Sequence, residues 1–164
     1  MGQEFSELII FLLEKRRFAI PLPCVVKVIR AVAVTVIPDA GDMLHGVFDF
    51  QGELIPAVNL RKRFSLEKKE IAIGDRFVVV STAKRKLALV VDEVEEIRKI
   101  KAGELSSADV FFPGDPTVQD KLPGLESTFL LRDQNGVVII YDIEKLLKSE
   151  LEIQLDQLIQ VQQE

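Results

Sequence analysis

The expected fold follows from residues 46–64, which read Gly46-Val-Phe-Asp-Phe-Gln-Gly-Glu-Leu-Ile-Pro-Ala-Val-Asn-Leu-Arg-Lys-Arg-Phe64. Two runs of strand-forming residues flank Gly52, which can take a positive φ without steric strain and therefore suits a turn. Pro56 has no N–H to donate to a ladder, which predicts a sheet edge or a bulge there. Asn59 can cap a short helix that continues to Phe64. The stretch predicts a β-hairpin followed by a helical turn, with no side chain of catalytic type.

The same stretch resembles the signature of the CheW-like domain family, the adaptors of bacterial chemotaxis arrays. That signature reads roughly G-V-x-N-L-R-G-x-x-x-P-V-x-D-L-R-x-x-F. Here it stands as Gly46-Val47-Phe48-Asp49-Phe50-Gln51-Gly52, Pro56, Val58-Asn59-Leu60-Arg61 and Phe64. The resemblance extends from about Leu8 to Leu147. Gln51 departs from it, because the family usually has arginine at this position.

The resemblance implies a mainly β fold of two five-stranded, SH3-like β-barrels packed side by side, with short helices and a C-terminal helix. It also implies a non-enzymatic adaptor between the cytoplasmic tip of a methyl-accepting chemoreceptor and the regulatory domain of a CheA-type histidine kinase. Carried over by position, the candidate partner-binding residues are Val25, Lys27, Val28, Gly46, Gln51 and Gly52. Lys27 stands where many members have glutamate. Two explanations are open for the departures at Gln51 and Lys27. Either an Arg–Glu pair has been exchanged for a Gln–Lys arrangement that suits a different partner, or both positions are exposed and changed independently.

Composition limits the classes of partner. The 164 residues suggest one domain, residues 1–164, or two small halves that share a core. A hydrophobic content of 48% excludes a disordered chain. The net charge of −5, with no evident basic face, argues against nucleic acid as a partner. Cys24 is the only cysteine, so no internal disulfide can form, which fits a reducing compartment.

The N-terminus predicts a cytoplasmic location. It is acidic and lacks the basic region of a signal peptide. The apolar run from Leu8 to Leu13 is far shorter than the about 18 residues that span a membrane, so we expect no direct membrane insertion.

An internal repeat is the most informative pattern outside the signature. Lys15–Ile20 matches Lys84–Leu89, which aligns Ala19 with Ala88. Leu54–Lys62 matches Val137–Lys145, which aligns Asn59 with Asp142. The second pair is separated by more of the chain than the first, which places an insertion in the second copy, most naturally in the Pro- and Gly-rich loop at 111–124. We therefore expect two β-barrel halves, at about residues 15–66 and 77–147.

The remaining elements follow from local patterns. The sequence predicts a buried strand over 8–13, a return strand at 18–20, a short helix through Val25–Ile29, a linker over 68–75, strands over 77–80 and 87–91, a hairpin turning at 133–136, and a helix that Asp142 caps. This helix is expected at about 143–162. Its apolar stripe consists of Leu147, Leu151, Leu155, Leu158 and Ile159. Two roles stay open for the stripe: packing on the first barrel, or contact with a partner or a second copy in weak self-association.

Other reactive side chains have simpler interpretations than catalysis. With one histidine and one cysteine, we expect His45 to be an exposed loop residue and Cys24 a small, buried or half-buried one, with no metal and no cofactor. Asp39, Asp42 and Asp49 are expected to make local turn hydrogen bonds. The basic runs at 15–17 and 84–86 are expected at solvated hairpin tips. Two other functions remain open: a CheW-like scaffold of a non-chemotactic system, and a small enzyme whose site has no recognised motif.

Overall fold

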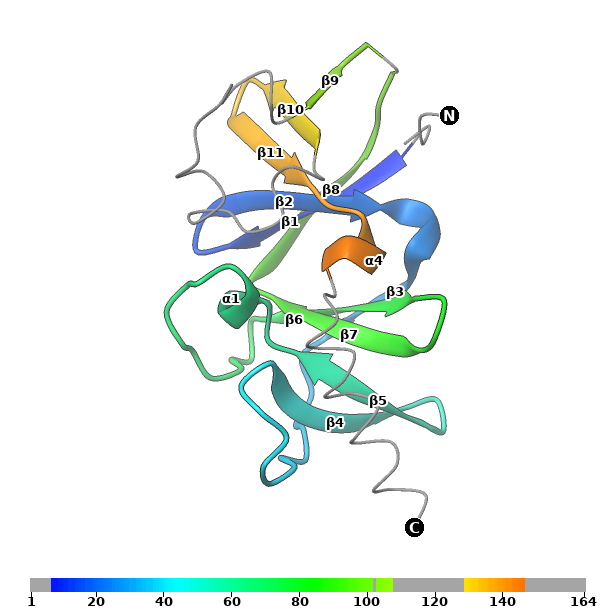
Figure 1. Ribbon diagram of the computed structural model, residues 1–164, viewed down its shortest axis with the longest axis vertical. Helices are drawn as coiled ribbons and strands as arrows, with labels where there is room; N and C mark the ends of the chain where they lie inside the picture. The colour runs from blue at the N-terminus through cyan, green and yellow to red at the C-terminus, as the bar shows by residue number, and fades with distance from the viewer. Residues whose placement is uncertain (1–6, 102, 108–128, 147–164) are drawn as a thin grey trace.

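The computed structural model describes residues 7–101, 103–107 and 129–146, and nearly all of its regular structure is β (Figure 1). In chain order the elements are β1 (Glu7–Leu13), β2 (Arg16–Pro21), the 3₁₀ turn η1 (Leu22–Cys24), β3 (Val25–Arg30), β4 (Leu44–Phe50), β5 (Glu53–Val58), α1 (Leu60–Arg63), β6 (Arg76–Ser81), β7 (Lys86–Val91), β8 (Glu93–Lys99), β9 (Leu105–Ser107), β10 (Phe129–Asp133), β11 (Gly136–Ile140) and α4 (Ile143–Leu146). The predicted mainly β class is confirmed. No helix within the described ranges is long and apolar enough to cross a membrane.

The strands form two sheets that are stacked along the long axis, with α1 and α4 between them (Figure 1). The first sheet has six strands in the order β8-β1-β2-β11-β10-β9, and the second has five in the order β3-β6-β7-β5-β4. The expected pair of SH3-like units is present as two sheets, but pairing of the described strands closes neither sheet into a barrel, and the first sheet has six strands where five were expected. In the second sheet the described chain after β3 forms a backbone pair with β4 only at Thr35 and Val47, which exchange hydrogen bonds of 2.8 and 2.9 Å.

The predicted internal repeat is confirmed by the register of the strands. Ala57 on β5 lies opposite Ala88 on β7, and Ile140 on β11 lies opposite Ala19 on β2, both in parallel pairs. The alignment of 15–20 with 84–89 matches Ala19 with Ala88, and the alignment of 54–62 with 137–145 matches Ala57 with Ile140. The two parallel pairs are therefore equivalent positions of the repeat. Each copy therefore lends strands to the other copy's sheet.

Because of this exchange, neither sheet is formed by one continuous stretch of the sequence. β1 and β2 join the sheet of β8 to β11, while β6 and β7 join the sheet of β3 to β5. The stretches 15–66 and 77–147 thus each contribute to both sheets, and the division into two barrel halves stays a prediction. The loop at 111–124 and the helix beyond Leu146, with its stripe from Leu147 to Ile159, lie outside the described residues.

Two local predictions fail for reasons of context. The helix expected through Val25–Ile29 is wrong: a 3₁₀ turn ends at Cys24, and the β-branched run then forms β3, where valine packs well on a pleated surface. Pro56 lies on β5, an interior strand, and not at an edge. It is tolerated there because the ladder to β7 contains only Ala57 and Val58, so β7 requires no donor from Pro56.

Three apolar clusters hold the sheets. The largest lies between them and contains stacked aromatic rings, with the Phe18 and Phe64 centroids 4.4 Å apart. A second cluster belongs to the five-stranded sheet and includes Phe48, Phe50 and Phe77. A third belongs to the six-stranded sheet and includes Leu8 and Ile10. Residues of β1 alternate between the inter-sheet cluster and the third cluster, as side chains on a strand must.

Candidate functional site

Three of the six sequence-predicted residues share β3, an edge strand of the five-stranded sheet. Val25 and Val28 are half-buried and pack against the inter-sheet cluster. Lys27 between them is exposed. A bulge at Val26 sets this arrangement, because Val25 pairs with Val80 and Lys27 with the next residue, Val79. These residues form a partly apolar border along the junction of the two sheets.

Gln51 and Gly52 lie elsewhere, at the exposed tip of the β4–β5 hairpin. Both have positive φ, +52° for Gln51 and +86° for Gly52, as the favoured two-residue hairpin turn requires. The Gly52 N–H donates to Asp49 Oδ1 at 3.1 Å, which confirms a local hydrogen-bonding role for Asp49. The turn presents Gln51 to solvent, where its side chain is free to contact a partner.

Gly46 is buried in β4, and it makes a close backbone contact. A Cβ atom at this position would lie 2.3 Å from the Thr35 carbonyl oxygen. Glycine is therefore required for the Thr35–Val47 bridge to form. The structure thus separates the six residues into the β3 border, the hairpin tip and one buried glycine.

Side chains also connect the edge strands β3 and β8 to strands at the far side of their own sheets. In the five-stranded sheet, Ile29 of β3 packs against the cluster that contains Phe50 of β4. In the six-stranded sheet, the repeat places Arg98 at the position of Ile29 and Asp133 at that of Phe50, and these two side chains form an ion pair. The repeat therefore places apolar residues at these two positions in one sheet and an ion pair in the other.

Arg17 extends this ionic contact. Its guanidinium donates to both oxygens of Asp133, at 2.7 and 2.8 Å, and to both oxygens of Glu95, at 2.7 and 3.2 Å. The hydrogen bond from Arg17 holds the pKa of Asp133 well below its usual value, and the same bond raises the pKa of Arg17 although burial opposes this. Arg17 was expected at a solvated tip. This is wrong, because the turn itself is Glu14-Lys15 and Arg17 lies on β2, 8% exposed.

A second ion cluster joins the signature helix to both sheets. Arg61 of α1 donates to Asp92, at 2.8 and 2.7 Å, and to Glu14 in the β1–β2 turn. The Glu14 N–H in turn donates to Asp92 at 3.0 Å. Burial alone would raise the pKa of Asp92, but the hydrogen bonds from Arg61 and from the Glu14 N–H together lower it further than burial raises it. Sequence reasoning missed both clusters, because their members are far apart in the chain.

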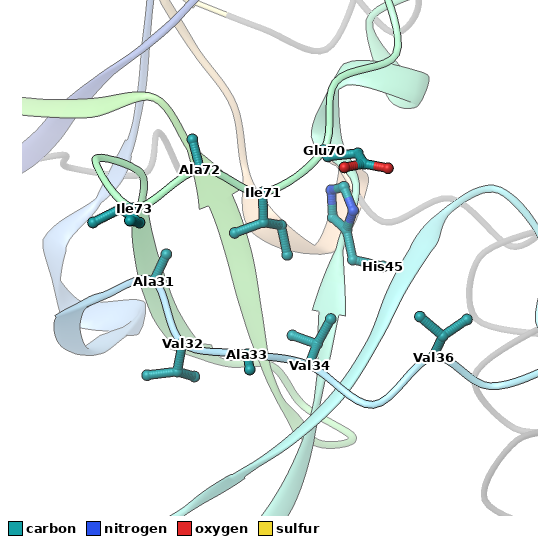
Figure 2. Close-up of a pocket in the computed structure, with 10 residues that line it drawn as sticks. All are labelled: Ala31, Val32, Ala33, Val34, Val36, His45, Glu70, Ile71, Ala72 and Ile73. Carbon is teal, nitrogen blue, oxygen red and sulfur yellow. The ribbon is translucent and has the colours of Figure 1, made fainter.

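A cavity of about 440 Å³ opens beside β4 (Figure 2). Its walls are Ala31, Val32, Ala33, Val34, Val36, His45, Glu70, Ile71, Ala72 and Ile73. The His45 ring lies beside the Glu70 carboxylate at one end (Figure 2). His45 was expected to be an exposed loop residue. This is wrong, because it lies half-buried on β4, where loss of solvent lowers its pKa.

Cys24 is half-buried, as expected, and its thiol donates to the Pro21 carbonyl oxygen at 3.0 Å. Burial raises the thiol pKa to about 11, so little reactive thiolate forms near neutral pH. Within the described ranges, no three His, Cys, Asp or Glu side chains are arranged to hold a metal ion. The candidate residues at the surface are the half-buried Val25 and Val28 and the exposed Lys27 and Gln51, which suit contact with another protein.

Comparison with known proteins gives a consistent result. The family model described as CheW-like domain matches residues 7–151. "Chemotaxis protein CheW" of Treponema pallidum is 27% identical over 156 residues, covering 91% of this chain and 86% of that protein. The protein of the same name from Klebsiella aerogenes is 28% identical over 150 residues, covering 92% and 84%. The crystal structure of scaffolding protein TtCheW from Thermoanaerobacter tengcongensis superposes with a TM-score of 0.73 at 20% identity, covering 92% of each chain, and shows the same fold.

Proposed function

This chain belongs to the CheW-like domain family of chemotaxis scaffold proteins, which are not enzymes, and we propose that it couples methyl-accepting chemoreceptors to a CheA-type histidine kinase. In this role it works in the cytoplasm, where both partners present their signalling domains. The chain transmits the signal by holding two partners in a fixed relation. Its two sheets, joined by a continuous core and by the Arg61 cluster, supply a rigid body for that purpose.

The β3 border is the observation that carries the receptor contact. Val25 and Val28 are half-buried at the junction of the sheets, so a partner helix laid along this junction would remove their remaining apolar surface from water. Lys27, which is exposed between them, would select an acidic group on that helix. Gln51 and Gly52 at the hairpin tip supply a second contact region, and the buried Gly46 supports it only indirectly, by letting β4 lie against Thr35.

The kinase contact follows from the internal repeat. The regulatory domain of a CheA-type kinase is itself CheW-like, so each sheet of this chain can meet an equivalent sheet of the kinase. The internal repeat supports this pseudo-symmetric packing. When strands related by the repeat are matched, β8-β1-β2-β11-β10 in one sheet has the same order as β3-β6-β7-β5-β4 in the other.

Binding of a purified receptor cytoplasmic fragment tests the proposal, with Val28→Lys as the variant. The repeat supplies a matched control, Ile97→Lys, because Ile97 occupies the position of Val28 in the other sheet: Val28 pairs with Val78 and Ile97 with Ile9. We expect Val28→Lys to weaken receptor binding at least tenfold and Ile97→Lys to leave it unchanged. Equal binding by the wild-type and Val28→Lys proteins, both folded by circular dichroism, would contradict the receptor contact.

A second candidate is a scaffold in a non-chemotactic signalling system. It is favoured by the two departures from the family pattern, since Lys27 and Gln51 are both exposed and alter the surface that a partner meets. Restoring the usual residues with Gln51→Arg and Lys27→Glu, singly and together, tests this candidate. Stronger receptor binding by the double variant than the single effects predict would show that the two positions act as one exchanged pair.

A further inference from the structure

The turn between β10 and β11 contains a reactive pair of residues that the adaptor function does not use. Asn135 is followed by Gly136, and both are exposed at the tip of the hairpin. In a peptide, the backbone nitrogen that follows an asparagine can attack Cγ of the asparagine side-chain amide. A following glycine favours this attack, because no Cβ stands beside its nitrogen. Asn59 is the only other asparagine of the chain, and leucine follows it.

The local structure leaves both reacting groups accessible. Gly136 has a φ of +118°, and a Cβ built there would meet no atom within 4 Å. Within the described ranges, no hydrogen bond involves the side-chain amide of Asn135. Asp133 and Gly136 form the last pair of the ladder, and the ends of elements open at little cost in free energy. Opening of this last pair frees the Gly136 nitrogen without unfolding the sheet.

Asn59 provides a comparison within the same chain. It is 7% exposed, and its Nδ2 donates to the Asp42 carbonyl oxygen at 3.2 Å. Its backbone N–H donates to the Met43 carbonyl oxygen at 2.8 Å. Leu60, which supplies the following nitrogen, is buried and begins α1. The side chain of Asn59 is therefore held in place, and we expect it to resist the reaction that Asn135 undergoes.

We propose that Asn135 is a site of spontaneous deamidation, which converts part of the β10–β11 turn to isoaspartate. The Gly136 nitrogen bonds to Asn135 Cγ while the bond from Cγ to Nδ2 breaks. Nδ2 leaves as ammonia and takes the proton of the Gly136 N–H, and a cyclic succinimide remains. Water then opens the ring at either of its carbonyl carbons, which gives aspartate or isoaspartate at position 135. The only co-reactant is water.

The ionic contact of Asp133 links this position to the stability of the fold. Asp133 Oδ1 accepts hydrogen bonds from the Asn135 N–H, at 2.8 Å, and from Arg17 Nη1, at 2.7 Å. Isoaspartate lengthens the main chain of the turn by a carbon atom and leaves a carboxylate beside Asp133. The longer chain does not fit the register in which Asp133 lies opposite Gly136, and the new charge competes for Arg17 and Arg98. The modified turn therefore weakens the contact between the two copies of the repeat.

Prolonged incubation of the purified full chain in mildly alkaline buffer, followed by peptide mapping in a mass spectrometer, tests the site. We expect the peptide with Asn135 to gain mass steadily, as a hydroxyl group replaces the amide, and to become a substrate for an isoaspartate methyltransferase. The peptide with Asn59 should keep its mass, and Asn135→Gln should stay unmodified at this position. An Asn135 peptide that keeps its mass while a free peptide of the same sequence converts overturns the proposal. Equal conversion of Asn59 and Asn135 also overturns it, because the reaction would then follow global unfolding.

Thermal melts test the link to Asp133. The incubated wild type should melt about 2–4 °C below the fresh protein, which is the shift expected for the loss of one turn contact in a domain of this size. Incubated Asn135→Gln should melt at the temperature of its fresh sample. Asn135→Asp carries the new charge without the longer main chain, so it should lose less than the incubated wild type. A wild type that contains isoaspartate at position 135 and melts at its original temperature would show that the turn does not support the Asp133 contact.

Discussion

Arg17 donates two parallel hydrogen bonds to Asp133, which lies 116 residues further along the chain: Nη1 to Oδ1 at 2.7 Å and Nη2 to Oδ2 at 2.8 Å. This bidentate geometry is the strongest form of an arginine–carboxylate contact. It joins β2 of the first copy to the β10–β11 hairpin of the second, so it holds the exchanged strands in register.

Replacing Arg17 should therefore destabilise the fold. Arg17→Ala removes the cation that Glu95 and Asp133 share, while Asp133 keeps its ion pair with Arg98 and Glu95 is exposed, so we expect a loss of about 1–3 kcal/mol. Arg16→Ala is the control, because Arg16 is exposed and its change should stay within about 0.5 kcal/mol. Urea unfolding measures both. A midpoint for Arg17→Ala equal to that of Arg16→Ala would show that the cluster is not a stabilising contact.

Asp133 should also make the protein sensitive to acid. Its folded pKa lies below the unfolded value of about 3.9, so the unfolded state binds more protons and stability falls as the pH drops. The contribution is complete above about pH 4 and is lost below it. Asp133→Asn should lower stability at neutral pH but flatten its decline between about pH 4 and 2. Parallel pH–stability curves for the two proteins would contradict this assignment.

His45, the only histidine, should produce a separate effect at milder pH. Its folded pKa is lowered by burial, while the unfolded side chain titrates near 6.5. As the pH falls below about 6.5, the unfolded state takes up a proton that the folded state does not, and stability decreases. His45→Gln should remove this slope, as thermal melts between about pH 7 and 5 would show. The imidazole NMR signal reports the folded pKa directly, and a value of about 6.5 or above would refute the prediction.

Gly46→Ala should disrupt the junction between β4 and the chain segment at Thr35. Its Cβ would meet the Thr35 carbonyl oxygen at 2.3 Å, which forces the backbone to move and costs roughly 1–3 kcal/mol or more. Gly74→Ala is the matched control, since a Cβ there meets no atom within 4 Å. We expect Gly74→Ala to be neutral or slightly stabilising. Equal melting temperatures for both variants would mean that the Thr35–Val47 bridge contributes nothing to stability.

Local patterns predicted the elements whose causes lie within a few residues. Apolar runs identified β1, β6 and β7, and the Gln51-Gly52 turn formed where glycine permits positive φ. Asp142 caps α4 by accepting the Glu144 N–H at 2.8 Å, as expected. Asn59 was only half predicted: α1 follows it, but its side chain donates to the Asp42 carbonyl oxygen instead of capping the helix. Competition from a tertiary partner decided that case.

The sequence by itself determined the duplicated β architecture, because both copies keep the same order of apolar runs, turn residues and caps, and these preferences act locally. Only the tertiary structure decided which strands are exchanged between the two sheets and which acids Arg17 and Arg61 contact. It also decided that His45 is half-buried, which lowers its pKa. The physical reason is that burial of apolar faces is non-directional and fixes no partner in advance. Once the two copies share one core, the packed strands bring together charges that lie 31 to 116 residues apart.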